Sequence, residues 1–176
     1  GEPCEHPLEM CMILSERAGA FDQNEGIRAL SLEEAHQTLR KAAEAGLVHS
    51  VSNSQKGFWY ICNCCTCSCG ILRGIAEFGI HNAVAHSDFI NQVDADLCTG
   101  CEECLPHCQF NALSLNDMIM TVSAQHCVGC GVCVMHCEAG AMQLVRREEK
   151  IIPPATEYDW LAERARVRHL DLDEVL

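Results

Sequence analysis

The sequence predicts an α+β protein made of three parts, and three observations support this prediction. Residues 1–91 carry helix and hairpin signals together with seven cysteines. Residues 92–147 contain an internal repeat with eight more cysteines, and residues 148–176 carry a helical pattern behind a proline pair. The 176 residues are enough for one substantial domain or two small ones, so we interpret the third part as a tail.

Fifteen cysteines are far above ordinary usage and indicate either a secreted disulfide scaffold or a metal protein. The odd count, the adjacent pair Cys64 and Cys65, and the Cys-x-x-Cys spacings favour metal binding. No secretory signal is visible, and no apolar run approaches the roughly 20 residues of a membrane helix. We therefore expect a cytoplasmic metal protein without a membrane span. The chain starts at Gly1, which favours a processed or partial chain.

The first part predicts helices around a hairpin. Residues 8–21 follow Pro7 and have a helical pattern. Ser31 with Glu34 three residues later is a capping box, so a second helix is expected from there until Gly46. The remaining predicted elements are a strand at 47–51, a turn at 53–57, a strand at 58–61 and a short helix at 71–78.

The second part repeats one cysteine motif at an offset of 29 residues, C-x-x-C-x-x-C-x-x-x-C. Three cysteines at this spacing can wrap one face of an iron–sulfur cube, while the fourth reaches the cluster of the other repeat. Gly100 and Gly129 let the backbone turn closely around the metal. Zinc sites normally use two separated pairs, so the spacing favours iron. The crossed assignment gives one [4Fe–4S] cluster to Cys98, Cys101, Cys104 and Cys137, and the other to Cys127, Cys130, Cys133 and Cys108.

On these motifs, residues 93–145 resemble the bacterial-type two-[4Fe–4S] ferredoxin domain. The resemblance implies a ferredoxin-like dicluster βαβ-βαβ fold with a short helix after each fourth cysteine. That family usually has proline directly after each fourth cysteine, where this chain has Gln109 and Glu138, each with a backbone N–H. His107 and His136 precede the fourth cysteines. We interpret them as solvated surface histidines, with proton-coupled redox tuning as the alternative.

Seven cysteines remain after the two clusters are filled, and five of them lie in the run "CNCCTCSC" between a strand and a helix. His6, in "CEHPLEMC", is available to complete a site. We expect at least one further iron–sulfur centre, with structural zinc or buried free thiols as the alternatives. The spacing does not select a subset, so the candidate ligands are Cys4, Cys11, Cys62, Cys64, Cys65, Cys67 and Cys69.

The combination of "CEHPLEMC", "ICNCCTCSCGILRG" and the two-cluster motif resembles a group of larger anaerobe proteins described only as 4Fe–4S binding proteins. This resemblance covers nearly the whole chain and implies that it is the C-terminal part of such a protein. The group commonly has three consecutive cysteines where this chain has Ser68 in the middle, so Ser68 is not expected to be an essential ligand. The resemblance implies a cofactor type and no particular reaction.

The formal net charge of −13 argues against nucleic acid as a partner, because no basic stripe is available to neutralise phosphates. The charge is uneven, since no Lys or Arg lies between Gly74 and Val145. This region is either an ordinary solvated surface or a face that steers a basic partner. Its eight acidic residues are Glu77, Asp88, Asp94, Asp96, Glu102, Glu103, Asp117 and Glu138.

The third part begins with a linker at Pro153 and Pro154, and Thr156 can cap a final helix. We expect this helix to pack on the body, with docking on a partner subunit as the alternative.

Taken together, the motifs predict a low-potential electron-transfer protein or subunit that serves a redox partner or a multi-subunit oxidoreductase. No nucleotide-binding glycine motif and no diagnostic nucleophile–base spacing is present. Two other classes stay open: an enzyme subunit with an open-site cluster in the N-terminal part, and a redox-sensing module.

Overall fold

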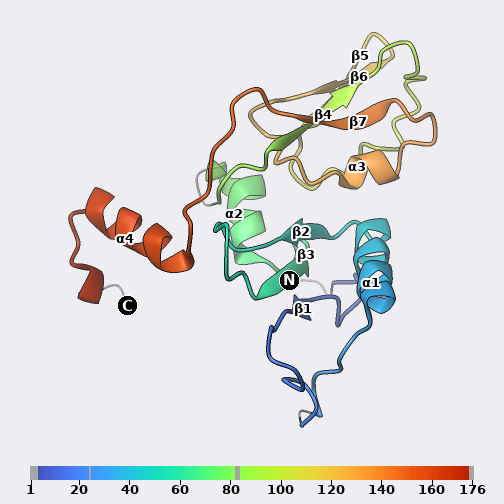
Figure 1. The fold of residues 1–176 in the computed structure, drawn as a ribbon. Helices are drawn as coiled ribbons and strands as arrows, with labels where there is room; N and C mark the ends of the chain where they lie inside the picture. Colours follow the sequence, from blue (N-terminus) through green and yellow to red (C-terminus); the bar gives the residue numbers. More distant parts are fainter. Residues whose placement is uncertain (1–3, 24, 82–83, 175–176) are drawn as a thin grey trace.

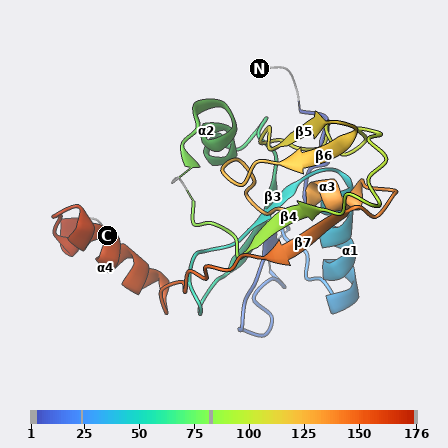
Figure 2. The same ribbon diagram turned by 90° about the horizontal axis from the view of Figure 1, so that it is seen from above.

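The computed structural model describes residues 4–23, 25–81 and 84–174, and it has the predicted α+β composition. Two sheet-containing parts lie against each other, and a helical tail extends from them (Figures 1 and 2). No helix in the described ranges is both long and apolar enough to cross a membrane.

The first part is a three-stranded antiparallel sheet with two helices. Its strands are β1 (Met12–Ile13), β2 (Val48–Ser50) and β3 (Tyr60–Cys64), and β3 lies in the middle. The predicted hairpin is confirmed as β2 against β3, but β3 continues to Cys64 and so includes two cysteines of the run. Helices α1 (Leu32–Glu44) and α2 (Gly70–Phe78) are also as predicted to within a few residues.

Helix α1 begins at the predicted capping box. The Ser31 hydroxyl accepts a hydrogen bond from the Glu34 N–H at 3.2 Å, and the Glu34 carboxylate accepts one from the Ser31 N–H at 2.8 Å. These bonds satisfy N–H groups that the first helical turn leaves free. The helix then turns back at Gly46 into β2.

The predicted helix over residues 8–21 is wrong. Strand β1 lies in this segment and pairs with β3, with Met12 opposite Ile61. The side chain of Asn63 also donates a hydrogen bond to the carbonyl oxygen of Met10. Met12 of β1 is buried, while Leu8, Ile13 and Leu14 stay exposed, so this segment buries little apolar surface against the body. Most helical stability in proteins comes from such burial, and strand pairing takes its place.

The second part contains two antiparallel strand pairs related to the repeat. Strand β4 (Phe89–Val93) of the first repeat pairs with β7 (Met142–Arg146) of the second. Strands β5 (Leu113–Asn116) and β6 (Ile119–Val122) form a hairpin between them. The outer strands of the two repeats are thereby joined. The proposed divisions of the chain after residues 91 and 147 stay a prediction.

The helix expected after each fourth cysteine is not found in the described residues. Helix α3 (Val132–Met135) ends before Cys137, and the matching segment of the first repeat forms only turns. Proline is pre-organised for the first position of a helix. Gln109 and Glu138 replace it here, so the chain lacks that signal after both fourth cysteines.

Gln109 instead links the two parts. Its side-chain carbonyl accepts a hydrogen bond from the backbone N–H of Thr66 at 2.7 Å, and its side-chain amide donates to the carbonyl oxygen of Gly46. Next to it, buried Phe110 packs with apolar side chains of the first part: Val48, Leu72 and Ile75. A proline at position 109 could make neither hydrogen bond, so the departure from the ferredoxin pattern has a structural use.

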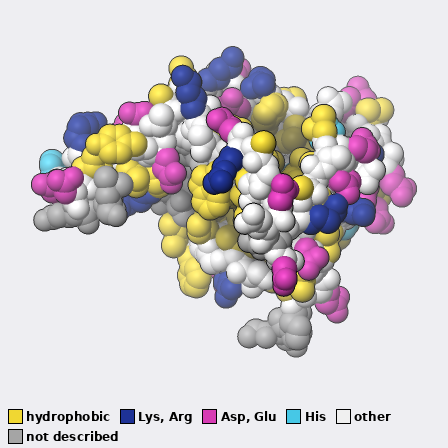
Figure 3. Space-filling view, turned by 60° about the horizontal axis from the view of Figure 1, so that its bottom comes forward, with side chains coloured by type: hydrophobic (Ala, Val, Ile, Leu, Met, Phe, Trp, Pro, Cys, Tyr) yellow, Lys and Arg dark blue, Asp and Glu magenta, His cyan; other side chains and the backbone are white. Residues whose placement is uncertain are grey.

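The tail packs differently from the expectation. Its linker is bound to the hairpin loop, because Gln55 and Lys56 donate backbone hydrogen bonds to Pro154 and Ala155 at 2.9 and 3.1 Å. Helix α4 (Glu157–Val167) itself projects away in both views and contacts the short 3-10 helix η2 (Leu172–Glu174). Hydrophobic side chains gather on this projection (Figure 3). Packing of the helix on the body is therefore wrong, and partner docking stays a prediction.

Replacing Gln109 by Leu tests the link between the two parts. Two hydrogen bonds are lost at about 1 kcal/mol each, so the free energy of unfolding should fall by about 2 kcal/mol and the Tm by about 4–8 °C. Hydrogen exchange at the Thr66 amide should accelerate as well. Exposed Gln143→Leu on β7 is the matched control. Equal exchange at Thr66 in both variants would contradict the link.

Candidate metal centres

The eight cysteines of the repeat line two small cavities. In each cavity the fourth cysteine of one repeat lies with the first three cysteines of the other. This is the grouping of the crossed assignment. The first cavity is lined by Cys98, Cys101, Cys104 and Cys137, and the second by Cys108, Cys127, Cys130 and Cys133.

Two glycines make the tight turns at these cavities possible. Gly100 and Gly129 have φ values of +68° and +73°, which side chains with a Cβ rarely adopt. A Cβ on Gly100 would lie 2.6 Å from the carbonyl oxygen of Met118, and one on Gly129 would collide with the carbonyl of Phe89. The predicted tight turns at both glycines are confirmed, while close approach to a metal stays a prediction.

Several N–H groups point at the sulfur atoms. The backbone N–H groups of Met120 and Ala112 lie 3.4 and 3.3 Å from the sulfurs of Cys98 and Cys108. The buried side chain of Asn91 on β4 donates to the sulfur of Cys133 at 3.0 Å. Sequence reasoning missed Asn91, whose only signal is its position on the inward face of a strand. Such donors stabilise negative charge on a cluster and tune its potential.

The electrostatics of the thiols also fit a cationic cluster core. Burial raises the pKa of Cys133 to about 12, and the nearby thiols of Cys130 and Cys108 raise it further. Burial likewise raises the pKa values of Cys104 and Cys130 to about 11. Four thiolates in one cavity repel one another unless a cation lies between them. Iron supplies that charge, and coordinated thiols are deprotonated.

His107 and His136 lie between the two cavities. Their rings stack with centroids 3.5 Å apart and planes 2° apart, and each lines one cavity. The Nε2 atom of His136 is buried and has no hydrogen-bond partner in the described ranges. Burial, and then His107, lowers the pKa of His136. The interpretation as a solvated surface histidine is wrong for His136, whose Nε2 is buried, and it stays a prediction for half-buried His107. Proton-coupled tuning stays a prediction.

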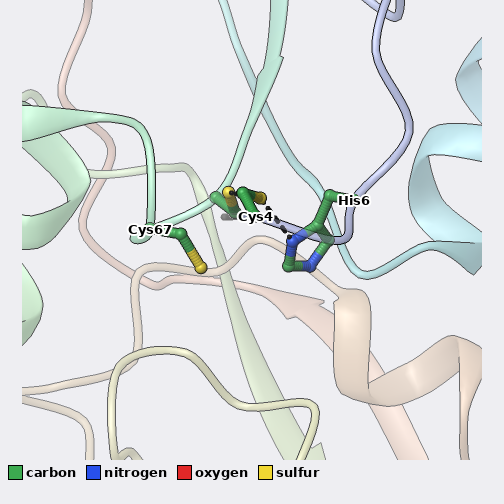
Figure 4. A group of neighbouring side chains, drawn as sticks. Cys4, His6 and Cys67 are labelled. Carbon is green, nitrogen blue, oxygen red and sulfur yellow. Dashed lines mark hydrogen bonds between the residues drawn. The ribbon is translucent and has the colours of Figure 1, made fainter. Parts of the chain in front are cut away.

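A tight group of four ligands forms in the first part. The ligand atoms of Cys4, His6, Cys65 and Cys67 all lie within 4.8 Å of one another. Cys4 and His6 come from the N-terminal segment and face Cys67 from the loop before α2 (Figure 4). The Cys4 sulfur lies 3.1 Å from His6 Nδ1 and 3.4 Å from the Cys65 sulfur. Of the seven extra cysteines, this group takes three and uses His6.

The thiols of this tight group differ in how readily they ionise. Burial acts against ionisation of Cys65, but hydrogen bonds from Cys4 and Ser68 outweigh it and lower its pKa. The hydrogen bond with Cys65, and then burial, raises the pKa of Cys67. Ser68 therefore interacts with a candidate ligand, and the expectation that it is not itself a ligand stays a prediction.

The other four cysteines gather beside this group. The sulfurs of Cys11 and Cys62 lie 4.0 Å apart. Burial raises the pKa of Cys62 to about 11, and the thiols of Cys11, Cys64 and Cys69 each add to this effect. The seven cysteines thus fall into two spatial groups, which their spacing in the sequence did not reveal.

Comparison with known proteins agrees with the repeat. A model of the 4Fe–4S binding domain matches residues 91–114 and again residues 120–143. Each match covers one copy of the cysteine motif and its neighbouring strand residues. No curated protein matches the chain.

Asn91→Leu should make the reduction potential of the neighbouring cluster more negative, because the donor to the Cys133 sulfur is lost. The expected shift is on the order of 30–60 mV, up to a tenfold change in the reduction equilibrium. Potentiometric titration followed by EPR measures it. Gln92→Leu is the matched control, because it lies on the same strand but is exposed. An unchanged potential in Asn91→Leu would show that the hydrogen bond has no effect.

Proposed function

We propose that this protein is a low-potential electron carrier that relays single electrons through two crossed [4Fe–4S] clusters and serves a redox partner protein or a multi-subunit oxidoreductase. The observation that carries this proposal is the pair of cavities, each lined by four cysteines from both repeats. When bound, the clusters supply one-electron redox chemistry. The chain's residues hold the clusters, exclude water and set their potentials.

The polypeptide provides an environment for low potentials. Cys104 and Cys133 are buried, with 6% and 8% of their surface exposed, and burial away from water disfavours added negative charge. The region from Gly74 to Val145 adds carboxylates and no Lys or Arg. Negative surroundings disfavour the addition of an electron, which moves the potential downward.

The acidic surface also favours a basic partner. Six of the eight acidic residues between Gly74 and Val145 are exposed. Asp88 is half-buried and pairs with Arg146 at 3.3 Å, so its charge is already matched. The exposed carboxylates would raise the encounter rate with a positively charged protein at low salt. Fifteen unpaired thiols are typical of a reducing compartment, which agrees with a cytoplasmic location.

The tight group of Cys4, His6, Cys65 and Cys67 fits a single tetrahedral metal ion. Zinc–sulfur bonds of about 2.3 Å place tetrahedral ligand atoms roughly 3.8 Å apart. The ligand atoms here lie within 4.8 Å of one another and need only small movements. We assign this group a structural role, because it ties the N-terminal segment to the loop before α2.

Crossed ligation can be tested with two serine variants and one marker. Cys137→Ser should perturb the cluster of Cys98, Cys101 and Cys104, and Cys108→Ser should perturb the other one. The marker is Asn91→Leu, which shifts only the cluster that includes Cys133. Its shift should persist in the Cys137→Ser background and vanish in the Cys108→Ser background, as followed by EPR-monitored redox titration. The reverse pattern would contradict crossed ligation.

The carrier function itself is tested on anaerobically purified protein. We expect at least two one-electron transitions at low potential and no change of the clusters on addition of small-molecule substrates. A substrate-dependent change in the EPR spectrum would contradict the carrier and favour the enzyme. Oxygen-triggered cluster loss that alters partner binding would favour the sensor.

A further inference from the structure

We propose that Cys11, Cys62, Cys64 and Cys69 bind a third [4Fe–4S] cluster, separate from the tight group and next to the second ferredoxin cluster. The choice of these four ligands is argued only from contacts in the first part of the chain. The redox role of the third cluster rests on the proposed function.

The four thiols come together through the sheet and the helix behind it. Side chains two apart on a strand point to the same side, so Cys62 and Cys64 share one side of β3 while buried Asn63 takes the other. Strand β1 runs alongside and brings the Cys11 sulfur to 4.0 Å from that of Cys62. Cys69 is the residue before α2, and its side chain makes no capping hydrogen bond.

Cys64 and Cys69 meet on a shared apolar support. Both pack against the buried side chains of Val48, Leu72 and Ile75. The backbone N–H of Cys69 also donates to the carbonyl oxygen of Cys65 at 2.9 Å, which closes the loop that separates the two cysteines. On one side of this turn, Cys65 and Cys67 lie near Cys4. On the other side, Cys64 and Cys69 pack on the apolar support.

The spacing of the four thiols indicates a cluster rather than a single ion. Within the described ranges, the tight group is the only set of three or more His, Cys or acidic ligand atoms that all lie within 4.8 Å of one another. The two ferredoxin sets do not meet this spacing, and neither does the set proposed here. A cube of iron and sulfide occupies the space between its thiolates, so a cluster requires the wider spacing that a single tetrahedral ion excludes.

The same apolar support leads to the second ferredoxin cluster. Phe110 completes the layer of Val48, Leu72 and Ile75, and the layer also contacts Cys108 and Cys130. One layer of side chains therefore separates the proposed ligands Cys64 and Cys69 from ligands of that cluster. A single electron could pass from a reduced cluster, which becomes [4Fe–4S]²⁺, to its oxidised neighbour, which becomes [4Fe–4S]⁺. No atom or proton moves, and the redox partner supplies the electron.

Metal analysis of variants tests the assignment. Anaerobically purified protein, reconstituted with iron and sulfide, should contain about 12 iron and 12 sulfide per chain plus one further metal ion. The pair Cys62→Ser/Cys64→Ser should lose about 4 iron and keep the EPR signal that responds to Asn91→Leu. The control pair Cys65→Ser/Cys67→Ser should lose the single ion and keep the iron of all three clusters.

A second variant keeps the proposal testable if the double variant fails to fold. Cys11 is exposed and directly precedes the edge strand β1, so Cys11→Ser should leave the sheet intact and convert the cluster to a three-iron form with an EPR signal in its oxidised state. About 8 iron with two zinc ions per wild-type chain would overturn the third cluster and leave the carrier function standing. Failure of the eight repeat cysteines to hold iron, with the third cluster present, would overturn the carrier function alone.

Discussion

The pairing of β1 with β3 is the interaction on which the N-terminal part depends. A two-residue edge strand contributes few hydrogen bonds, yet it fixes the whole segment from Cys4 to Ile13 beside the cysteine run. Asn63 strengthens it, because its side chain joins the Met10 carbonyl on one side and His49 of β2 on the other. One buried amide in the central strand thus joins three strand segments through hydrogen bonds. As a result, cysteines that are distant in the sequence lie close together.

The geometry of β3 explains how one short run can serve two centres. Alternation along the strand separates Cys62 and Cys64 from Asn63, and the turn after Cys64 sends Cys65 the other way. Adjacent cysteines would otherwise compete for one metal. Here Cys64 packs on the apolar layer that reaches Phe110, while Cys65 lies against Cys4. The dense run thus places thiols on both sides of one chain segment.

The ferredoxin repeat and the N-terminal part form one continuous structure through position 109 and its neighbours. Gln109 follows directly on Cys108 and bonds to Thr66, which stands between Cys65 and Cys67. A few covalent and hydrogen bonds therefore join the two groups of cysteines. The apolar contacts of Phe110 occur at the same interface as the hydrogen bonds of Gln109, and both residues lie next to Cys108.

The sequence by itself determined the features that depend on local spacing. The motif period identified the two repeats and their eight cysteines, Ser31 and Glu34 located a helix start, and Gly100 and Gly129 marked turns that tolerate no Cβ. These signals are local because a loop around a cluster, a capped turn and a left-handed backbone are each set by a few neighbouring residues.

Only the tertiary structure decided the features that depend on contacts between distant segments. It replaced the helix expected over residues 8–21 by a strand, divided the seven extra cysteines into two groups, stacked His107 on His136 and gave Gln109 and Asn91 their partners. A single sequence does not show which segments are in contact, because hydrophobic periodicity and secondary-structure propensity describe one segment at a time. Strand pairing across about fifty residues brings the thiols of Cys11 and Cys62 together.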